Sequence, residues 1–234
     1  MFGFAPVKVL LLGDVHGHLP GNDRPTWEFL AELVDASPWP CLQAGDIGRY
    51  PPLRRPLYFI FGNNDWPPAP KSPAYVNLRP GEPVVLAAGS ETLTVGGLNG
   101  VYDPAYYARP GLIPAAERGL FFTPADVAAC ARLRNIDIFL AHGVPAGFGL
   151  GREPDHAVPA LRELLEEIRP RFFVCGHAHR FASLTDLHTG TTVIVLGELR
   201  REFYILDTAS GELIRVPTAA GLSVGRLFAG LGGR

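Results

Sequence analysis

Two histidine-containing runs near opposite ends of the chain carry side chains that could bind a metal ion. They are Asp14-Val15-His16 and Gly176-His177-Ala178-His179. Three further polar groups lie between them in the sequence, at Gly45-Asp46, at Gly62-Asn63-Asn64-Asp65 and at His142. Carboxylate, amide and imidazole donors together suit a divalent transition-metal ion better than they suit a thiolate site or an all-oxygen site. The residue types therefore indicate metal-dependent chemistry.

Each of these polar groups follows an apolar run that is typical of a buried β-strand. The runs cover residues 7–12, 41–44, 57–61, 136–141 and 171–175. Ligands of α/β proteins bind beyond the carboxyl ends of such strands, so the polar groups are expected to meet at one edge of a sheet. Helical patterns over 25–35, 124–133 and 158–168 alternate with the strands, and this alternation predicts the α/β class.

The remaining segments are predicted from turn residues and shorter patterns. Residues 66–83 are rich in proline and are expected to form an ordered surface loop, and 99–123 a long loop containing tyrosines. Residues 83–88 and 91–97 read as two strands joined at Gly89-Ser90. Further strands are expected over 191–196, 202–207 and 212–216, and the helix before 168 is expected to begin at Asp155 or His156. The glycine-rich end, 222–234, is expected to be frayed.

Composition describes an ordinary globular chain, which we interpret as a single domain over residues 1–234. Hydrophobic residues make up 47% and charged residues 19%, which excludes a disordered protein. The net charge of −2 and the absence of a basic stripe disfavour nucleic acid and an anionic membrane surface as partners. Three widely spaced cysteines predict buried reduced thiols, and the first apolar stretch is too short for a membrane span. The cytoplasm is the expected compartment, and the oligomeric state is left open.

In their types and order, the five polar groups resemble the signature motifs of the calcineurin-like metallophosphoesterase superfamily, over residues 14–179. The resemblance implies a sandwich of two facing mixed β-sheets flanked by helices. It also implies two divalent transition-metal ions, with manganese as the first expectation and iron, zinc, nickel or cobalt as alternatives. The first ion would be held by Asp14, His16, Asp46 and His179. The second would be held by Asp46, Asn63, His142 and His177, so that Asp46 bridges the two ions.

The function implied by this resemblance is a dinuclear-metal-dependent phosphoesterase, which hydrolyses phosphate esters by in-line attack of a metal-bridging hydroxide. Residues 96–102 and 136–142 also resemble the RNA lariat debranching branch, so RNA or nucleotide processing is one alternative. A non-catalytic scaffold on the same fold is another. A scaffold would be expected to have lost some metal ligands, whereas all seven are present, and this favours the enzyme.

The sequence departs from the family pattern at Asn64, where many members carry a histidine that protonates the leaving oxygen. Asparagine can donate a hydrogen bond but cannot act as a general acid, so phosphodiesters are expected to be better substrates than phosphomonoesters. His18 could replace the missing acid, or it could be a solvent-facing loop residue. We therefore assign catalytic roles to Asp46, Asn64 and His18. Asn64, Arg49 and Arg180 are expected to bind the substrate phosphate, although both arginines could equally be ordinary surface residues.

Overall fold

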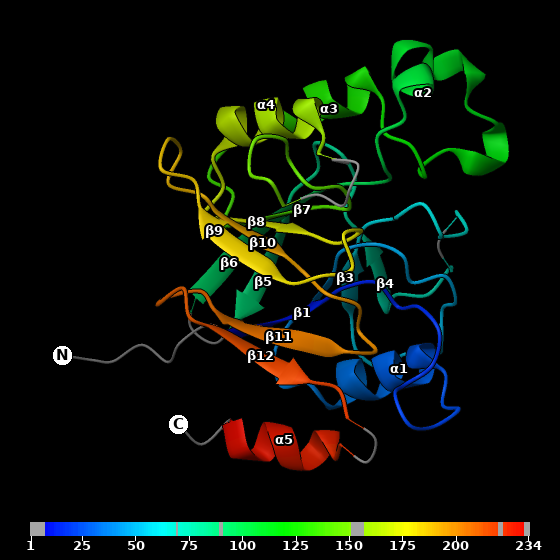
Figure 1. Ribbon diagram of the computed structural model, residues 1–234, viewed down its shortest axis with the longest axis vertical. Helices are drawn as coiled ribbons and strands as arrows, with labels where there is room; N and C mark the ends of the chain where they lie inside the picture. The colour runs from blue at the N-terminus through cyan, green and yellow to red at the C-terminus, as the bar shows by residue number, and fades with distance from the viewer. Residues whose placement is uncertain (1–7, 69, 89–90, 151–156, 220–221, 232–234) are drawn as a thin grey trace.

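The computed structural model describes residues 8–68, 70–88, 91–150, 157–219 and 222–231, which form two six-stranded sheets (Figure 1). The first sheet has the order β12-β11-β1-β2-β3-β4, with strands at Leu213–Pro217, Glu202–Asp207, Lys8–Leu12, Cys41–Gln43, Leu57–Phe59 and Tyr75–Asn77. The second has the order β5-β6-β7-β8-β10-β9, with strands at Val84–Ala88, Glu91–Leu98, Ile138–Ala141, Phe172–Cys175, Thr192–Val195 and Ala182–Thr185. The two-sheet α/β fold implied by the resemblance is confirmed.

Both sheets are mixed: the antiparallel pairings lie on one side of the first sheet and at both edges of the second. β1 to β4 run parallel in the first sheet, and β6, β7, β8 and β10 run parallel in the second. β11, β12, β5 and β9 pair antiparallel with their neighbours. Because parallel strands end at the same edge, the loops that follow β1, β2 and β3 leave the first sheet together, as do those after β7 and β8 in the second.

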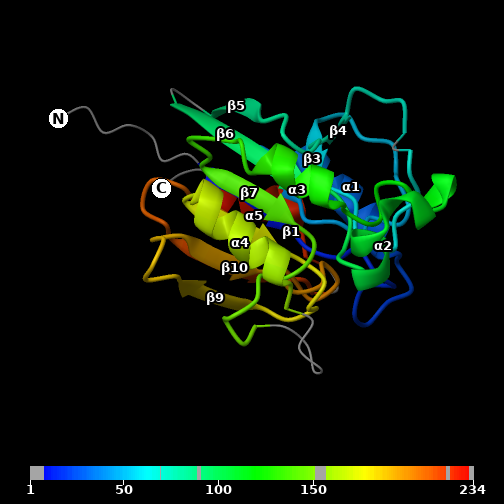
Figure 2. The ribbon, with the colours of Figure 1, turned by 90° about the horizontal axis from the view of Figure 1, so that it is seen from above.

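The core has three layers, and strand β1 shows how alternation of side chains builds them. Val9 and Leu11 face the second sheet, where they join the cluster between the two sheets. Leu10 and Leu12 face the opposite way and pack with α1 (Thr26–Ala36) and α5 (Val224–Leu231). A third cluster lies between the second sheet and α3 (Pro124–Cys130) and α4 (Pro159–Ile168). Figures 1 and 2 show these helices on the outer faces of the sandwich.

Two segments expected to lack regular structure contain it. Within the proline-rich stretch 66–83, β4 pairs in parallel with β3, since its three residues include no proline and can join the ladder. Within 99–123, α2 (Pro104–Ala108) begins at Asp103, whose carboxylate accepts hydrogen bonds from the backbone of the first turn. Two 3₁₀ turns follow, at Pro110–Leu112 and Ala115–Glu117.

The C-terminal segment 222–234 was expected to be frayed, and this expectation is wrong for its described part. Val224–Leu231 forms α5, in which Val224 and Phe228 are buried against the first sheet. The Phe228 ring also packs edge-on against Trp39, with ring centroids 5.5 Å apart. These apolar contacts, spaced four residues apart, stabilise the helix despite its glycines. The expected helix start at Asp155 or His156 and the Gly89-Ser90 turn lie outside the described residues.

The three thiols are free and buried, as the sequence predicted for Cys41, Cys130 and Cys175. Burial raises the pKa of each thiol, to about 12 for Cys41 and Cys130. They are therefore neutral, unreactive core side chains. Among the described residues, none of the helices has the length and apolar character needed to cross a membrane.

Candidate metal centre

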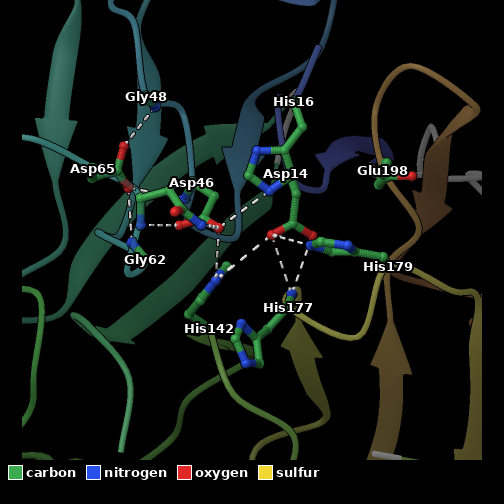
Figure 3. A network of polar contacts seen from close by, with 12 residues as sticks. Asp14, His16, Asp46, Gly48, Gly62, Asp65, His142, His177, His179 and Glu198 are labelled. Carbon is green, nitrogen blue, oxygen red and sulfur yellow. Dashed lines mark hydrogen bonds and ion pairs between the residues drawn. The ribbon is translucent and has the colours of Figure 1, made fainter. Parts of the chain in front are cut away.

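The side chains that the sequence predicts as metal ligands gather where the central strands of both sheets end (Figure 3). Each comes from the loop after a strand: β1 supplies two, β2 and β3 one each, β7 one, and β8 two. In that order they are Asp14, His16, Asp46, Asn63, His142, His177 and His179. The first sheet thus contributes both carboxylates, and the second contributes three of the four imidazoles.

Glycines allow these loops to approach one another closely. A Cβ atom placed on Gly62 would overlap the Asp46 carboxylate, so only glycine lets the β3 loop cross the β2 loop here. Gly45 has a φ of +96°, and a Cβ placed there would lie 2.5 Å from His142 Nδ1. Gly62 therefore permits the contact between the β2 and β3 loops, and Gly45 the contact between the two sheets; the site depends on both.

Two carboxylates and an imidazole nitrogen converge at the centre of the site. Asp14 and Asp46 are both buried, and His142 Nε2 lies 3.6 Å from Asp14 Oδ1 and 3.3 Å from Asp46 Oδ2. His142 Nδ1 lies 2.7 Å from the carbonyl oxygen of Ala44. A carbonyl can only accept, so Nδ1 carries the proton of the neutral ring and Nε2 presents a lone pair. Nε2 is buried and makes no hydrogen bond among the described residues.

This arrangement places electron-rich atoms together and favours a positive charge between them. Burial alone would lower the pKa of His142, but the carboxylates of Asp46 and Asp14 outweigh it and raise that pKa to about 9. Either a proton on Nε2 or a metal cation can balance the negative charge of the two carboxylates, so the two compete for this position. A divalent ion would neutralise the carboxylates and accept the Nε2 lone pair at once, which matches how imidazole binds metals when its other nitrogen is held by a backbone carbonyl.

His16 and His179 extend the cluster on the side of the β1 loop. His16 Nε2 is 3.3 Å from Asp46 Oδ2, and His179 Nε2 is 4.0 Å from Asp14 Oδ1. In each of two groups, Asp14-His16-His179 and Asp14-Asp46-His142, the potential ligand atoms all lie within 4.8 Å of one another. The residue common to both groups is Asp14, whereas the sequence predicted Asp46 as the shared residue. Asp46 nevertheless contacts histidines of both groups, so both carboxylates lie between them.

Asn63 and His177 lie next to this cluster in different ways. Asn63 Oδ1 is buried and has no hydrogen-bond donor among the described residues. An orphaned buried oxygen costs free energy, and ligation of a cation would satisfy it. The backbone N–H of His177 donates to the Asp14 carboxylate at 3.1 Å, and its ring centroid is 5.0 Å from that of His142. Ligation by the seven predicted residues remains a prediction, and the donor set fits a transition-metal ion.

Three of these residues adopt a backbone conformation that side chains other than glycine rarely take. Asp46, His177 and His179 have φ values of 62°, 62° and 55°. Such residues are strained and are concentrated at functional sites. The surrounding loops must hold these residues in place, so the arrangement of the predicted ligands is maintained at a cost in folding free energy.

Asp65 is a part of this site to which the sequence assigned no role of its own. It is buried, and Oδ2 accepts hydrogen bonds from the backbone N–H groups of Asp46 and Gly62 at 2.9 and 2.7 Å. Oδ1 accepts from the N–H of Gly48 at 2.9 Å and from the hydroxyl of Tyr50 at 3.2 Å. One carboxylate therefore joins the β2 and β3 loops. Its place in Gly62-Asn63-Asn64-Asp65 was the only sequence signal.

Asn64 contacts Asp46, a contact that the sequence did not suggest. Its backbone N–H and its side-chain Nδ2 donate to the two oxygens of Asp46, both at 2.7 Å. Burial alone would raise the pKa of Asp46, but His142, His16 and Asn64 hold it well below its usual range. In this structure Asn64 thus orients an ionised Asp46. Its role toward a leaving group stays a prediction.

The other predicted residues, His18, Arg49 and Arg180, have contacts of their own. His18 is exposed and lines an open hollow with Arg200 and Arg201. Arg49 lies over the ring of Trp27, with its guanidinium carbon 4.5 Å from the centroid. Arg180 is exposed and donates to the carbonyl of Gly149 at 3.4 Å. The contacts described for the two arginines are thus with Trp27 and Gly149.

Comparison with known proteins identifies a matching family and solved structures of similar fold. The family model described as calcineurin-like phosphoesterase matches residues 7–181, well over half of the chain. A solved protein from Thermus thermophilus, TT1561, superposes with a TM-score of 0.61 at 14% identity, covering 92% of this chain and 100% of that one. GAP50 of Plasmodium, described as an anchor in the inner membrane complex, gives 0.50 at 10% identity, covering 92% and 89%. These likenesses show the fold. A comparison with curated protein sequences found no significant match.

Proposed function

Because the chain belongs to the calcineurin-like phosphoesterase family, we propose that it hydrolyses phosphodiesters with two divalent transition-metal ions. One observation carries this proposal: the lone pair of His142 Nε2 points into a buried space between the carboxylates of Asp14 and Asp46. Nε2 of the neutral ring, both carboxylates and Asn63 Oδ1 all present lone pairs there, and Asn63 Oδ1 has no donor among the described residues, so a metal cation would satisfy these acceptors together.

The predicted metal ligands supply different kinds of donor atom. Asp14 and Asp46 supply negative charge, the histidines supply neutral nitrogen donors, and Asn63 supplies a neutral oxygen. This mixture suits manganese, with iron, zinc, nickel or cobalt as alternatives, better than it suits magnesium. When bound, two such ions supply a nucleophile at neutral pH and neutralise the oxygens of the scissile phosphate. The Asn64 amide donates a hydrogen bond to the Asp46 carboxylate, and the Asp65 carboxylate accepts one from the backbone N–H of Asp46.

Two observations support diesters over monoesters as substrates. Asn64, the residue at the position of the usual acid, cannot release a proton, and its amide is engaged by Asp46. Arg49 lies over the ring of Trp27, which supports a site without this guanidinium to neutralise the second charge of a monoester. The site therefore suits a monoanionic phosphate with a stable leaving group.

A scaffold role is the second candidate, because the Plasmodium neighbour with the same fold is described as an anchor. The complete set of converging donors favours an enzyme for this chain, because a scaffold has no need of buried acceptors without donors. We also propose a cytoplasmic location, which the three buried free thiols support.

The test is a hydrolysis assay with Mn²⁺ on bis(p-nitrophenyl) phosphate and on p-nitrophenyl phosphate. We expect faster turnover of the diester and no measurable turnover by Asp46→Asn. Asp207→Asn is the matched control, because Asp207 also accepts backbone hydrogen bonds but lies at the end of β11. Equal rates for Asp46→Asn and Asp207→Asn, or no Mn²⁺-dependent turnover by the unaltered protein, would contradict the proposal.

A further inference from the structure

The loop after β10 runs beside the metal-binding cluster and carries charges that the proposed reaction does not use. The backbone N–H of Leu199 donates to the carbonyl of Asp14 at 2.9 Å, which attaches this loop to the β1 loop. Glu198 precedes it and is only 4% exposed. Figure 3 shows Glu198 on the side of the cluster away from Asp65. A buried carboxylate in this place needs partners of opposite charge.

Glu198 has two such partners, which lie two and three residues further along the chain. Arg200 donates to both carboxylate oxygens, with Nε–Oε1 at 3.1 Å and Nη2–Oε2 at 3.0 Å. Arg201 Nε lies 3.1 Å from Glu198 Oε2. Two guanidinium groups therefore share one carboxylate, and a single positive charge remains uncompensated within this triad. The fork held on Glu198 also fixes the orientation of the Arg200 guanidinium, which leaves Nη1 outside that pairing.

Arg200 and Arg201 line an open hollow of about 400 Å³ together with His18 and Pro20. The hollow adjoins the metal-binding cluster, because a Cβ atom placed on Gly17 would lie 3.7 Å from Arg200 Nη1. Gly17 directly follows His16, a predicted ligand of the first ion. The oriented guanidinium thus lies beside the residue that follows a predicted metal ligand, in a hollow of a size that ligand sites have.

We propose that this hollow binds a second phosphate group of the substrate, so that the preferred substrate is a phosphodiester that carries another phosphoryl group. This proposal rests on the proposed function, since the scissile phosphate is taken to lie at the metal centre. Arginine pairs bind phosphate through several charge-assisted hydrogen bonds. A single arginine would neutralise Glu198, so the second one supplies the positive charge that a further anion needs. The second phosphate is either joined to the scissile one in a diphosphate or separated from it by a sugar.

The first experiment measures binding without metal, so that it does not depend on turnover. Inorganic phosphate is titrated into chelator-treated protein and followed by NMR shifts of backbone amides. We expect shifts at residues 17–19 and 198–201, and a dissociation constant raised about tenfold or more in Arg200→Gln, as loss of a charge-assisted contact requires. Arg200→Lys, which keeps the charge but not the fork, should recover part of the binding. Arg215→Gln is the matched control, because Arg215 pairs with Glu202 across β12 and β11 and is not among the residues that line the hollow. Equal binding by both glutamine variants overturns the proposal.

The second experiment compares kcat/KM with Mn²⁺ for three substrates: a dinucleotide, the same dinucleotide with a terminal phosphate, and a dinucleoside diphosphate. We expect one of the two substrates with an additional phosphate to exceed the plain dinucleotide, and that one identifies where the second phosphate lies. This advantage should shrink about tenfold or more in Arg200→Gln and persist in Arg215→Gln. If the plain dinucleotide is cleaved with no such advantage, the subsite is refuted while the phosphodiesterase stands. If no diester is cleaved, the proposed function fails, and the phosphate titration then tests by itself whether the hollow binds phosphate.

Discussion

Replacing Asp65 with asparagine should destabilise the protein and weaken metal binding together. The carboxylate accepts three backbone hydrogen bonds and one from Tyr50. Asparagine can keep one oxygen toward Asp46 and Gly62, but its NH₂ group must then face the N–H of Gly48. Two bonds lose their charge assistance at about 1 kcal/mol each, and a buried N–H loses its acceptor at about 1–3 kcal/mol. The expected loss is therefore roughly 3–5 kcal/mol.

The stability is measured by denaturant unfolding of metal-free protein, and the metal affinity by titration with Mn²⁺. Asp207→Asn is the control. The backbone N–H groups of Ala209 and Ser210 both donate to one oxygen of Asp207, Oδ1. Asparagine can provide that oxygen, so the control should lose less than about 1 kcal/mol. If Asp65→Asn loses no more than the control, or loses stability while its metal affinity is unchanged, Asp65 does not hold the site as inferred.

Three other predictions concern the residues around Asp46. Asn64→Ala removes the donor to Asp46 Oδ2, and Mn²⁺ affinity should fall about 10–100-fold, measured by chelator competition. Gly62→Ala places a methyl group against the Asp46 carboxylate, so the variant should bind little metal by elemental analysis; normal loading would show that the loop can move aside. His142 must lose a proton to bind metal, and its raised pKa is about 9 in the metal-free protein. Mn²⁺ affinity should therefore fall about tenfold for each pH unit below 9 and level off above it; a flat profile between pH 7 and 9 would exclude this competition.

The sequence predicted the central strands and the loops that follow them because both leave local signals. β1, β2, β3, β7 and β8 are apolar runs that end in polar groups, and the structure places them close to the expected residues. β9 leaves a weaker signal, since it is an edge strand with alternate residues exposed. α5 was missed because its glycines suggested fraying, whereas burial of Val224 and Phe228 depends on contacts with residues far away in the chain.

For the site, the sequence predicted the residue types but not their detailed relations. That the seven predicted ligands would meet followed from their places after strands. The roles of Asp65 and Asn64 toward Asp46 did not, because they depend on how the β3 loop crosses the β2 loop at Gly62. Nothing in the sequence linked Glu198 to the metal-binding cluster either, since that link depends on contacts between distant segments, such as the backbone hydrogen bond from Leu199 to Asp14.

Anomalous diffraction from crystals grown with Mn²⁺ tests the central claim most directly. We expect two manganese peaks in each chain, one of them coordinated by His142 Nε2 and Asn63 Oδ1, the two buried acceptors that have no donor among the described residues. Both carboxylates, Asp14 and Asp46, should contact the ions. A single peak, or His142 Nε2 left uncoordinated beside the ions, would contradict the dinuclear site from which the proposed function follows.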